Sequence, residues 1–125
     1  MSSLLFVAAG LMLLLSVAHS YLGERYILIR LFRKADLPRL FGGTDFTKRT
    51  LRFAWHLTSV LALGFAALLV VLGAGTRDLP RATAVVISAT SLLCGFVALF
   101  GSRARHLSWL VLFAVAVLTW LGART

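Results

Sequence analysis

Three histidines and one glutamate are the side chains of this chain that could do chemistry beside its apolar segments. His19 and His56 lie inside long apolar runs, His106 lies at the start of another, and Glu24 follows the first run. Imidazole nitrogens and carboxylate oxygens are ligands for Zn, Fe or Cu, and two imidazoles can hold a haem iron. One hypothesis is therefore a metal or haem site formed by His19, His56, His106 and Glu24.

The spacing of these residues leaves other interpretations open. No single helix would offer two ligands, because the chain has no His-x-x-x-His or Glu-x-x-His pattern, and His19 and Glu24 would lie about 140° apart around a helix. In a second interpretation each imidazole makes one hydrogen bond to a neighbouring helix. Glu24 then pairs with a nearby arginine: Arg49, Arg52, Arg103 or Arg105. A third interpretation is the handling of a proton or substrate.

Other catalytic patterns are missing from the sequence. No Ser or Thr stands in a nucleophile-elbow pattern, and no Cys–His pair is adjacent. The segment 42–45 lacks the Gly-Lys-Ser/Thr ending of a phosphate-binding loop. The single cysteine, Cys94, cannot form an intramolecular disulfide. The sequence therefore gives no positive indication of an enzyme.

The elements that must position the histidines are four apolar runs without Lys, Arg, Asp or Glu: Leu4–Leu22, Phe53–Leu72, Ala82–Phe100 and Leu107–Leu121. At about 1.5 Å of rise per residue, a run of about 19 or 20 residues reaches about 28–30 Å, the thickness of the hydrocarbon core of a bilayer. The fourth run is shorter and needs its flanks to span, over about 105–123. The sequence predicts an all-α, single-domain fold, a four-helix up-down transmembrane bundle.

Composition supports a membrane protein and argues against other classes. Hydrophobic residues make up 60% of the chain and charged residues 14%, and the mean hydropathy is +0.94, so little polar surface is available for a soluble globule. The net charge of +9 comes mostly from residues beside helix ends, where anionic lipid headgroups are nearer partners than nucleic acid. We expect lipid contact and no nucleic-acid binding.

Basic residues also predict the orientation. Eight lie between positions 25 and 52, and Arg103 and Arg105 lie in the third connection, whereas the opposite side has three: Arg77, Arg81 and Arg124. The positive-inside rule places the side with ten in the cytoplasm. Because positions 1–3 contain no Lys or Arg, we interpret the first run as an uncleaved helix rather than a secretory signal. The prediction is a bacterial inner (plasma) membrane protein with both termini periplasmic and a basic cytoplasmic loop.

The connections carry local signals. The segment Tyr26–Lys34 either extends the first helix or lies in the headgroup plane, with Arg30, Arg33 and Lys34 among headgroups. Helix-start signals occur at the beginning of each later helix: Thr44 or Asp45, then Asp78 or Leu79 with Pro80 in the first turn, then Ser102.

Small residues recur on one face of the third helix at spacings of four, three, four and three: Ala84, Ser88, Ser91, Gly95 and Ala98. Such a seam lets another helix approach closely, within the bundle or in an oligomer.

Taken together, the sequence favours a small non-enzymatic accessory or interaction subunit of the inner membrane. Its partners would be anionic headgroups of the bilayer and a membrane protein or a second copy of the chain. One alternative is a metal- or haem-binding redox protein that uses its histidines at the cytoplasmic leaflet. A second alternative is a small oligomeric transporter.

Overall fold

The protein is all-helical in the computed structural model, which describes residues 2–125. The elements are α1 (Ser3–Leu22), the π-helical η1 (Gly23–Leu28), α2 (Ile29–Leu31), α3 (Asp45–Ala74), α4 (Leu79–Ser102) and α5 (Ser108–Gly122). The first three form one continuous helical segment of 29 residues. In the connection that follows, one isolated bridge pairs Leu40 with Gly43.

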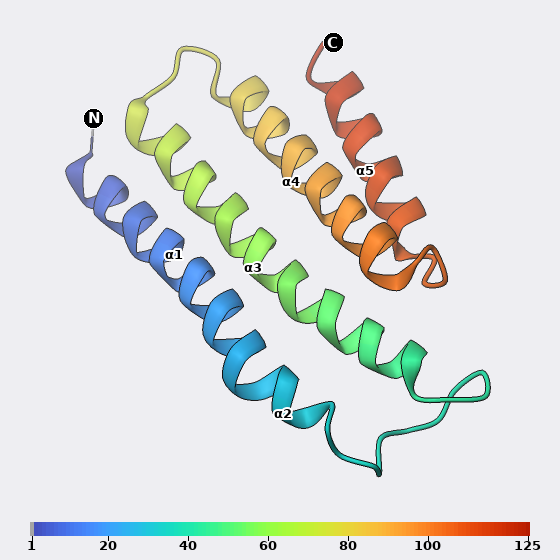
Figure 1. Cartoon of the computed structure of the whole chain (residues 1–125). Coiled ribbons are helices and arrows are strands. Elements are labelled where there is room, and N and C mark those ends of the chain that lie inside the picture. The colour runs from blue at the N-terminus through green and yellow to red at the C-terminus, as the bar shows by residue number, and fades with distance from the viewer. Residues whose placement is uncertain (1) are drawn as a thin grey trace.

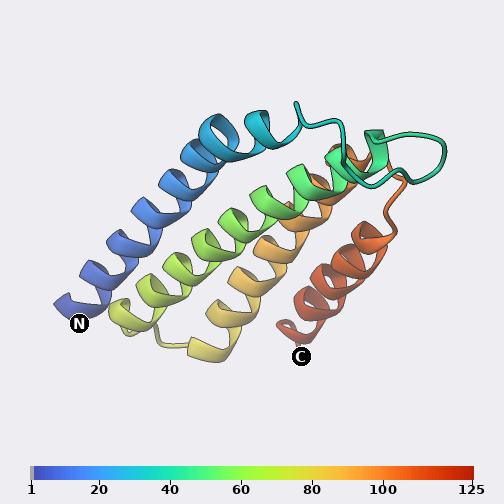
Figure 2. The ribbon, with the colours of Figure 1, turned by 90° about the horizontal axis from the view of Figure 1, so that it is seen from below.

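The four long helices lie side by side in chain order and alternate in direction, as predicted (Figure 1). α1 packs on α3, α3 on α4 and α4 on α5, and within residues 2–125 α1 makes no packing contact with α4 or α5. α1 and α5 form the two edges of the row, both chain termini lie at the same end of the helices, and the order is kept in the view turned by 90° (Figure 2). The up-down four-helix arrangement is therefore confirmed, as an open layer rather than a closed bundle.

Three helical segments are long and apolar enough to cross a membrane: Ser3–Leu31, Asp45–Ala74 and Leu79–Ser102. The last helix is shorter than the predicted span of 105–123. Arg103 and Ala104 have left-handed backbones, with φ of 52° and 61°, so they end α4 and delay α5 until Ser108. The 15 residues of α5 rise about 22 Å, less than the hydrocarbon core of about 30 Å.

Two of the three predicted helix starts are confirmed in position, but only one of them, at Asp78, has the predicted side-chain cap. α3 begins at Asp45 directly after Thr44, and the Asp78 carboxylate caps α4 by accepting the Arg81 N–H at 3.1 Å. Ser102 does not cap α5. Its hydroxyl donates to the Ala98 carbonyl at 2.6 Å instead, in the last turn of α4.

The small-residue seam of α4 packs inside the chain, against α5. Ser88, Gly95 and Ala98 are buried, and the Ser88 hydroxyl donates to the Ala116 carbonyl at 2.7 Å. A Cβ atom at Gly95 would lie 2.4 Å from the Phe113 ring, so glycine is needed for this approach. The sequence left open whether the seam packs within the chain or in an oligomer, and the structure shows packing within the chain.

Candidate functional site

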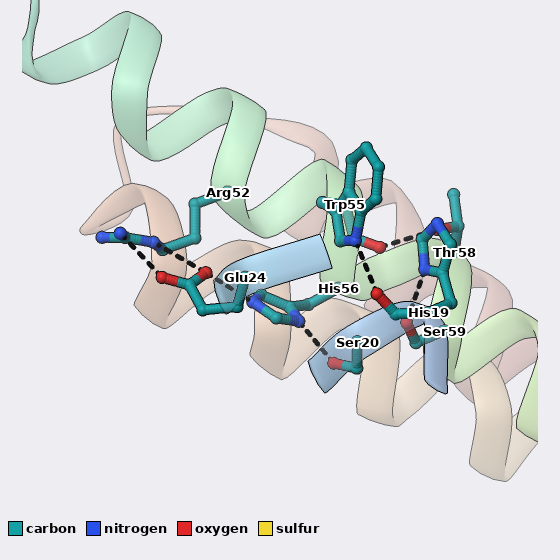
Figure 3. A network of polar contacts seen from close by, with 8 residues as sticks. All are labelled: His19, Ser20, Glu24, Arg52, Trp55, His56, Thr58 and Ser59. Carbon is teal, nitrogen blue, oxygen red and sulfur yellow. Dashed lines mark hydrogen bonds and ion pairs between the residues drawn. The ribbon is translucent and has the colours of Figure 1, made fainter. Parts of the chain in front are cut away.

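Polar side chains at the interface of α1 and α3 form the most distinctive cluster of the protein. Ser16, Ser20 and Glu24 follow one another at spacings of four, so they share the face that looks toward α3. In Figure 3, α1 and η1 supply His19, Ser20 and Glu24, and α3 supplies the side chains that meet them. We call this set of contacts the α1–α3 joint; it consists of Ser16, His19, Ser20, Glu24, Arg52, Trp55, His56 and Ser59.

Glu24 is the centre of one half of the joint. Its Oε1 accepts from Arg52 Nη2 at 2.8 Å, and its Oε2 lies 3.2 Å from both Arg52 Nε and His56 Nε2. The side chains of Glu24 and His56 are about 30% exposed (30% and 29%), and that of Arg52 is 49% exposed. One carboxylate is therefore shared between a guanidinium and an imidazole, as the dashed lines of Figure 3 show.

His56 also contacts Ser20, which gives the joint a superficial likeness to a hydrolytic triad. The Ser20 hydroxyl lies 2.6 Å from His56 Nδ1, and the opposite ring nitrogen faces Glu24. A serine nucleophile also needs N–H donors free to hold an oxyanion. Ser20 lies inside α1, and the nearby Gly23 N–H already donates to the His19 and Ser20 carbonyls. The contacts are thus those of a hydrogen-bonded chain between two helices.

His19 forms the other half of the joint. Its Nδ1 lies 3.0 Å from the Ser59 hydroxyl, and its ring stacks on Trp55 with centroids 4.5 Å apart. The Trp55 indole N–H donates to the His19 carbonyl at 3.0 Å, and the Ser16 hydroxyl donates to the Ser59 carbonyl at 2.7 Å. Side chains therefore bond to backbone across the interface in both directions.

Gly23 allows this close approach. A Cβ atom at this position would lie 2.0 Å from Trp55 Nε1, so any larger residue would displace the indole. Gly23 also begins η1, the π-helical turn that carries Glu24. Such turns are rare and frequently occur at functional sites.

His106 stands apart from the joint. It lies in the connection between α4 and α5, where its Nδ1 is 2.9 Å from the Ser108 hydroxyl. Its ring packs edge-on against Phe53, with centroids 5.2 Å apart. Thus His19 reaches α3 from α1, whereas His106 reaches it from the connection between α4 and α5.

The structure does not assemble the predicted set of four ligands. Glu24 and His56 are in contact, whereas His19 and His106 have separate partners. Among residues 2–125, no group of three or more His, Cys, Asp and Glu side chains could hold a metal ion. The observed contacts match the second interpretation in part: Glu24 pairs with Arg52 and His19 contacts Ser59 of α3, whereas His56 contacts both Ser20 and Glu24 and His106 contacts Ser108, two residues away.

A mostly apolar groove of about 560 Å³ lies beside the joint. Its lining residues are Ser16, Val17, Ser20, Tyr21, Glu24, His56, Ser59, Val60 and Leu63. Ser20 and Ser59 were not predicted as site residues. The spacing of four between Ser16, Ser20 and Glu24 was the signal in the sequence that could have indicated Ser20.

The residues predicted to contact headgroups lie at and beyond the end of the long first helix. Tyr26–Leu31 continue it, so the structure shows the helical extension as far as Leu31, and residues 32–33 form a turn. Arg30, Arg33 and Lys34 are exposed, and the Arg30 guanidinium lies 5.8 Å from the centre of the Tyr26 ring. Their contact with lipid remains a prediction.

Comparison of the chain with protein-family models, with curated proteins and with solved structures finds no match.

Proposed function

We propose that this chain is a non-enzymatic accessory or interaction subunit of the bacterial inner membrane, with both termini periplasmic. The observation that carries the proposal is that Glu24, His19 and His56 are engaged in contacts between the chain's own helices. Placing an ionisable side chain inside a bilayer costs free energy, so such a residue usually either has a function or pairs with another polar group. Here the pairing accounts for them.

The open layer supports a role in interaction. α1 and α5 each pack on one neighbouring long helix only, within the part of the chain that the structure describes. α5 also exposes large apolar side chains such as Leu118, which is 68% exposed. A helix of about 22 Å is shorter than the bilayer core, and such a mismatch is relieved by local thinning of the bilayer or by association with another protein. We infer that a membrane protein or a second copy covers α5.

The orientation is supported by charge. Ten basic residues occupy the side with the loop between α2 and α3, against three on the side with the termini. In a bacterial cell the positive-inside rule then puts the joint in the cytoplasmic leaflet.

Photo-crosslinking in living cells tests the interaction role. A photoreactive amino acid at Leu118 of α5 is expected to give a discrete protein adduct in the membrane fraction. Leu14 of α1 is the matched control, because it is an exposed leucine of nearly equal accessibility (67% against 68%) on the opposite edge of the layer. An adduct with the mass of two chains would identify a second copy as the partner. Lipid adducts alone at Leu118 would contradict the proposal.

A further inference from the structure

A second groove lies at the N-terminal end of α3 and shares His56 with the groove beside the α1–α3 joint. Its volume is about 430 Å³, and three separate parts of the chain line it. Phe32 comes from the end of the long first helix, Val97 and Phe100 come from α4, and the remaining wall comes mainly from α3. We call it the basic groove, after the cations of that wall: Lys48, Arg49 and Arg52.

The α3 wall of the basic groove has an excess of positive charge. Lys48, Arg52 and His56 recur at spacings of four, which places them on one stripe of the helix. Three cations stand against one lining acid, Asp45, which binds Arg49 at 2.9 Å. Arg52 is held by Glu24, while Lys48 has no acidic partner within 4.0 Å among residues 2–125. The groove therefore offers a free ammonium group beside a partly exposed guanidinium.

The rest of the lining is mainly apolar. It comes from Phe32, whose ring centre lies 4.9 Å from the Arg52 guanidinium, and from Val97 and Phe100 of α4, of which Phe100 is 70% exposed. The groove also includes Phe53, where the polar first turns of α3 pass into the apolar run. A ligand that fits both walls carries a negative head and an apolar chain.

The geometry points to a binding site for the phosphate of an anionic phospholipid, with the headgroup at Lys48 and Arg52 and an acyl chain along Val97 and Phe100. A soluble phosphate compound would use only the cationic wall and leave the aromatic side chains uncovered. A phospholipid would contact both parts of the groove, with its headgroup on the cationic residues and its acyl chain on the apolar residues beside them. The inference is independent of the accessory role, since it needs no protein partner.

Native mass spectrometry of the purified protein in an uncharged detergent tests the site. The probes are phosphatidylglycerol and phosphatidylcholine with the same acyl chains. We expect one phosphatidylglycerol to be retained in preference to phosphatidylcholine. The variant Lys48→Gln is expected to bind it about fivefold more weakly, as the loss of one basic residue near an anionic lipid implies. Arg39→Gln is the control, because it removes one positive charge outside the groove, in the loop that precedes α3, at an exposed residue that is not among the predicted headgroup contacts.

The inference is wrong if the two lipids are retained equally, or if Arg39→Gln and Lys48→Gln weaken binding to the same extent. Displacement of the lipid by an equal concentration of glycerol 3-phosphate would also overturn it, since the apolar wall would then contribute nothing. Phe100→Asp provides a second variant that needs no change on α3. We expect it to reduce lipid retention strongly, and unchanged retention would contradict the site.

Discussion

Gly95→Leu should separate α5 from α4. A Cβ atom at Gly95 would lie 2.4 Å from two carbons of the Phe113 ring, whereas carbon atoms ordinarily pack at about 3.5–4.0 Å. The ring cannot turn away freely, because it packs against Phe96 at 5.1 Å and Trp109 at 6.0 Å between centroids. Either α5 moves by about 1 Å or more, or the aromatic cluster rearranges. Overpacking of this kind costs about 1–3 kcal/mol.

Gly10→Leu is the matched control for this prediction. Gly10 also lies inside a long helix, but a Cβ atom there meets nothing within 4 Å. Both substitutions gain about 1 kcal/mol of intrinsic helix propensity, so their difference isolates the steric term of about 1–3 kcal/mol. Thermal unfolding in detergent, followed by tryptophan fluorescence, should show Gly95→Leu melting several degrees below Gly10→Leu. Equal melting temperatures would refute the packing of α4 on α5.

Three further predictions follow from the joint, the orientation and the loop. Gly23→Ala should destabilise the protein by about 1–3 kcal/mol in an SDS unfolding titration, because its Cβ would lie 2.0 Å from Trp55 Nε1; unchanged stability would contradict the close approach. In intact spheroplasts a membrane-impermeant thiol reagent should label Thr76→Cys and leave Gly43→Cys unlabelled, and the opposite pattern would reverse the orientation. A peptide of Tyr26–Lys34 should bind anionic vesicles more strongly than neutral ones, and equal binding would remove the electrostatic contribution.

Much of the fold could be predicted, because the lengths of the apolar runs determine the number of long helices and their approximate positions in the chain. The runs from Leu4, Phe53 and Ala82 all lie inside helices of the structure. The end of α4 was harder, because the left-handed backbone at Arg103 and Ala104 occurs at residues that do not usually signal it. The chain therefore turns later than expected, and α5 loses part of its predicted length.

The sequence predicted the position of the site along the helices, but not which side of α3 each histidine would contact. The sequence placed all three histidines toward one end of the helices, and in the structure His19 and His106 contact the stretch of α3 from Phe46 to Ser59, which contains His56. Which side of α3 each one meets depends on the order of the helices in the layer. Because α1 and α4 pack separately on α3, His19 and His106 reach it from different neighbours. The π-helical turn at Gly23 accompanies the approach of Trp55, a tertiary contact that has no local sequence signal.

A double-mutant cycle between Glu24 and His56 tests most directly the central claim, that these ionisable groups hold α1 against α3. The free energy of unfolding would be measured by SDS titration for Glu24→Ala, His56→Ala and the double variant. Polar contacts between membrane helices couple by about 0.6 kcal/mol on average and up to about 1.7 kcal/mol. We predict that both single variants destabilise the protein, with a coupling free energy of about 0.5–1.7 kcal/mol. Additive effects, with zero coupling, would contradict a structural role for this contact and would reopen the search for a ligand or a proton at Glu24.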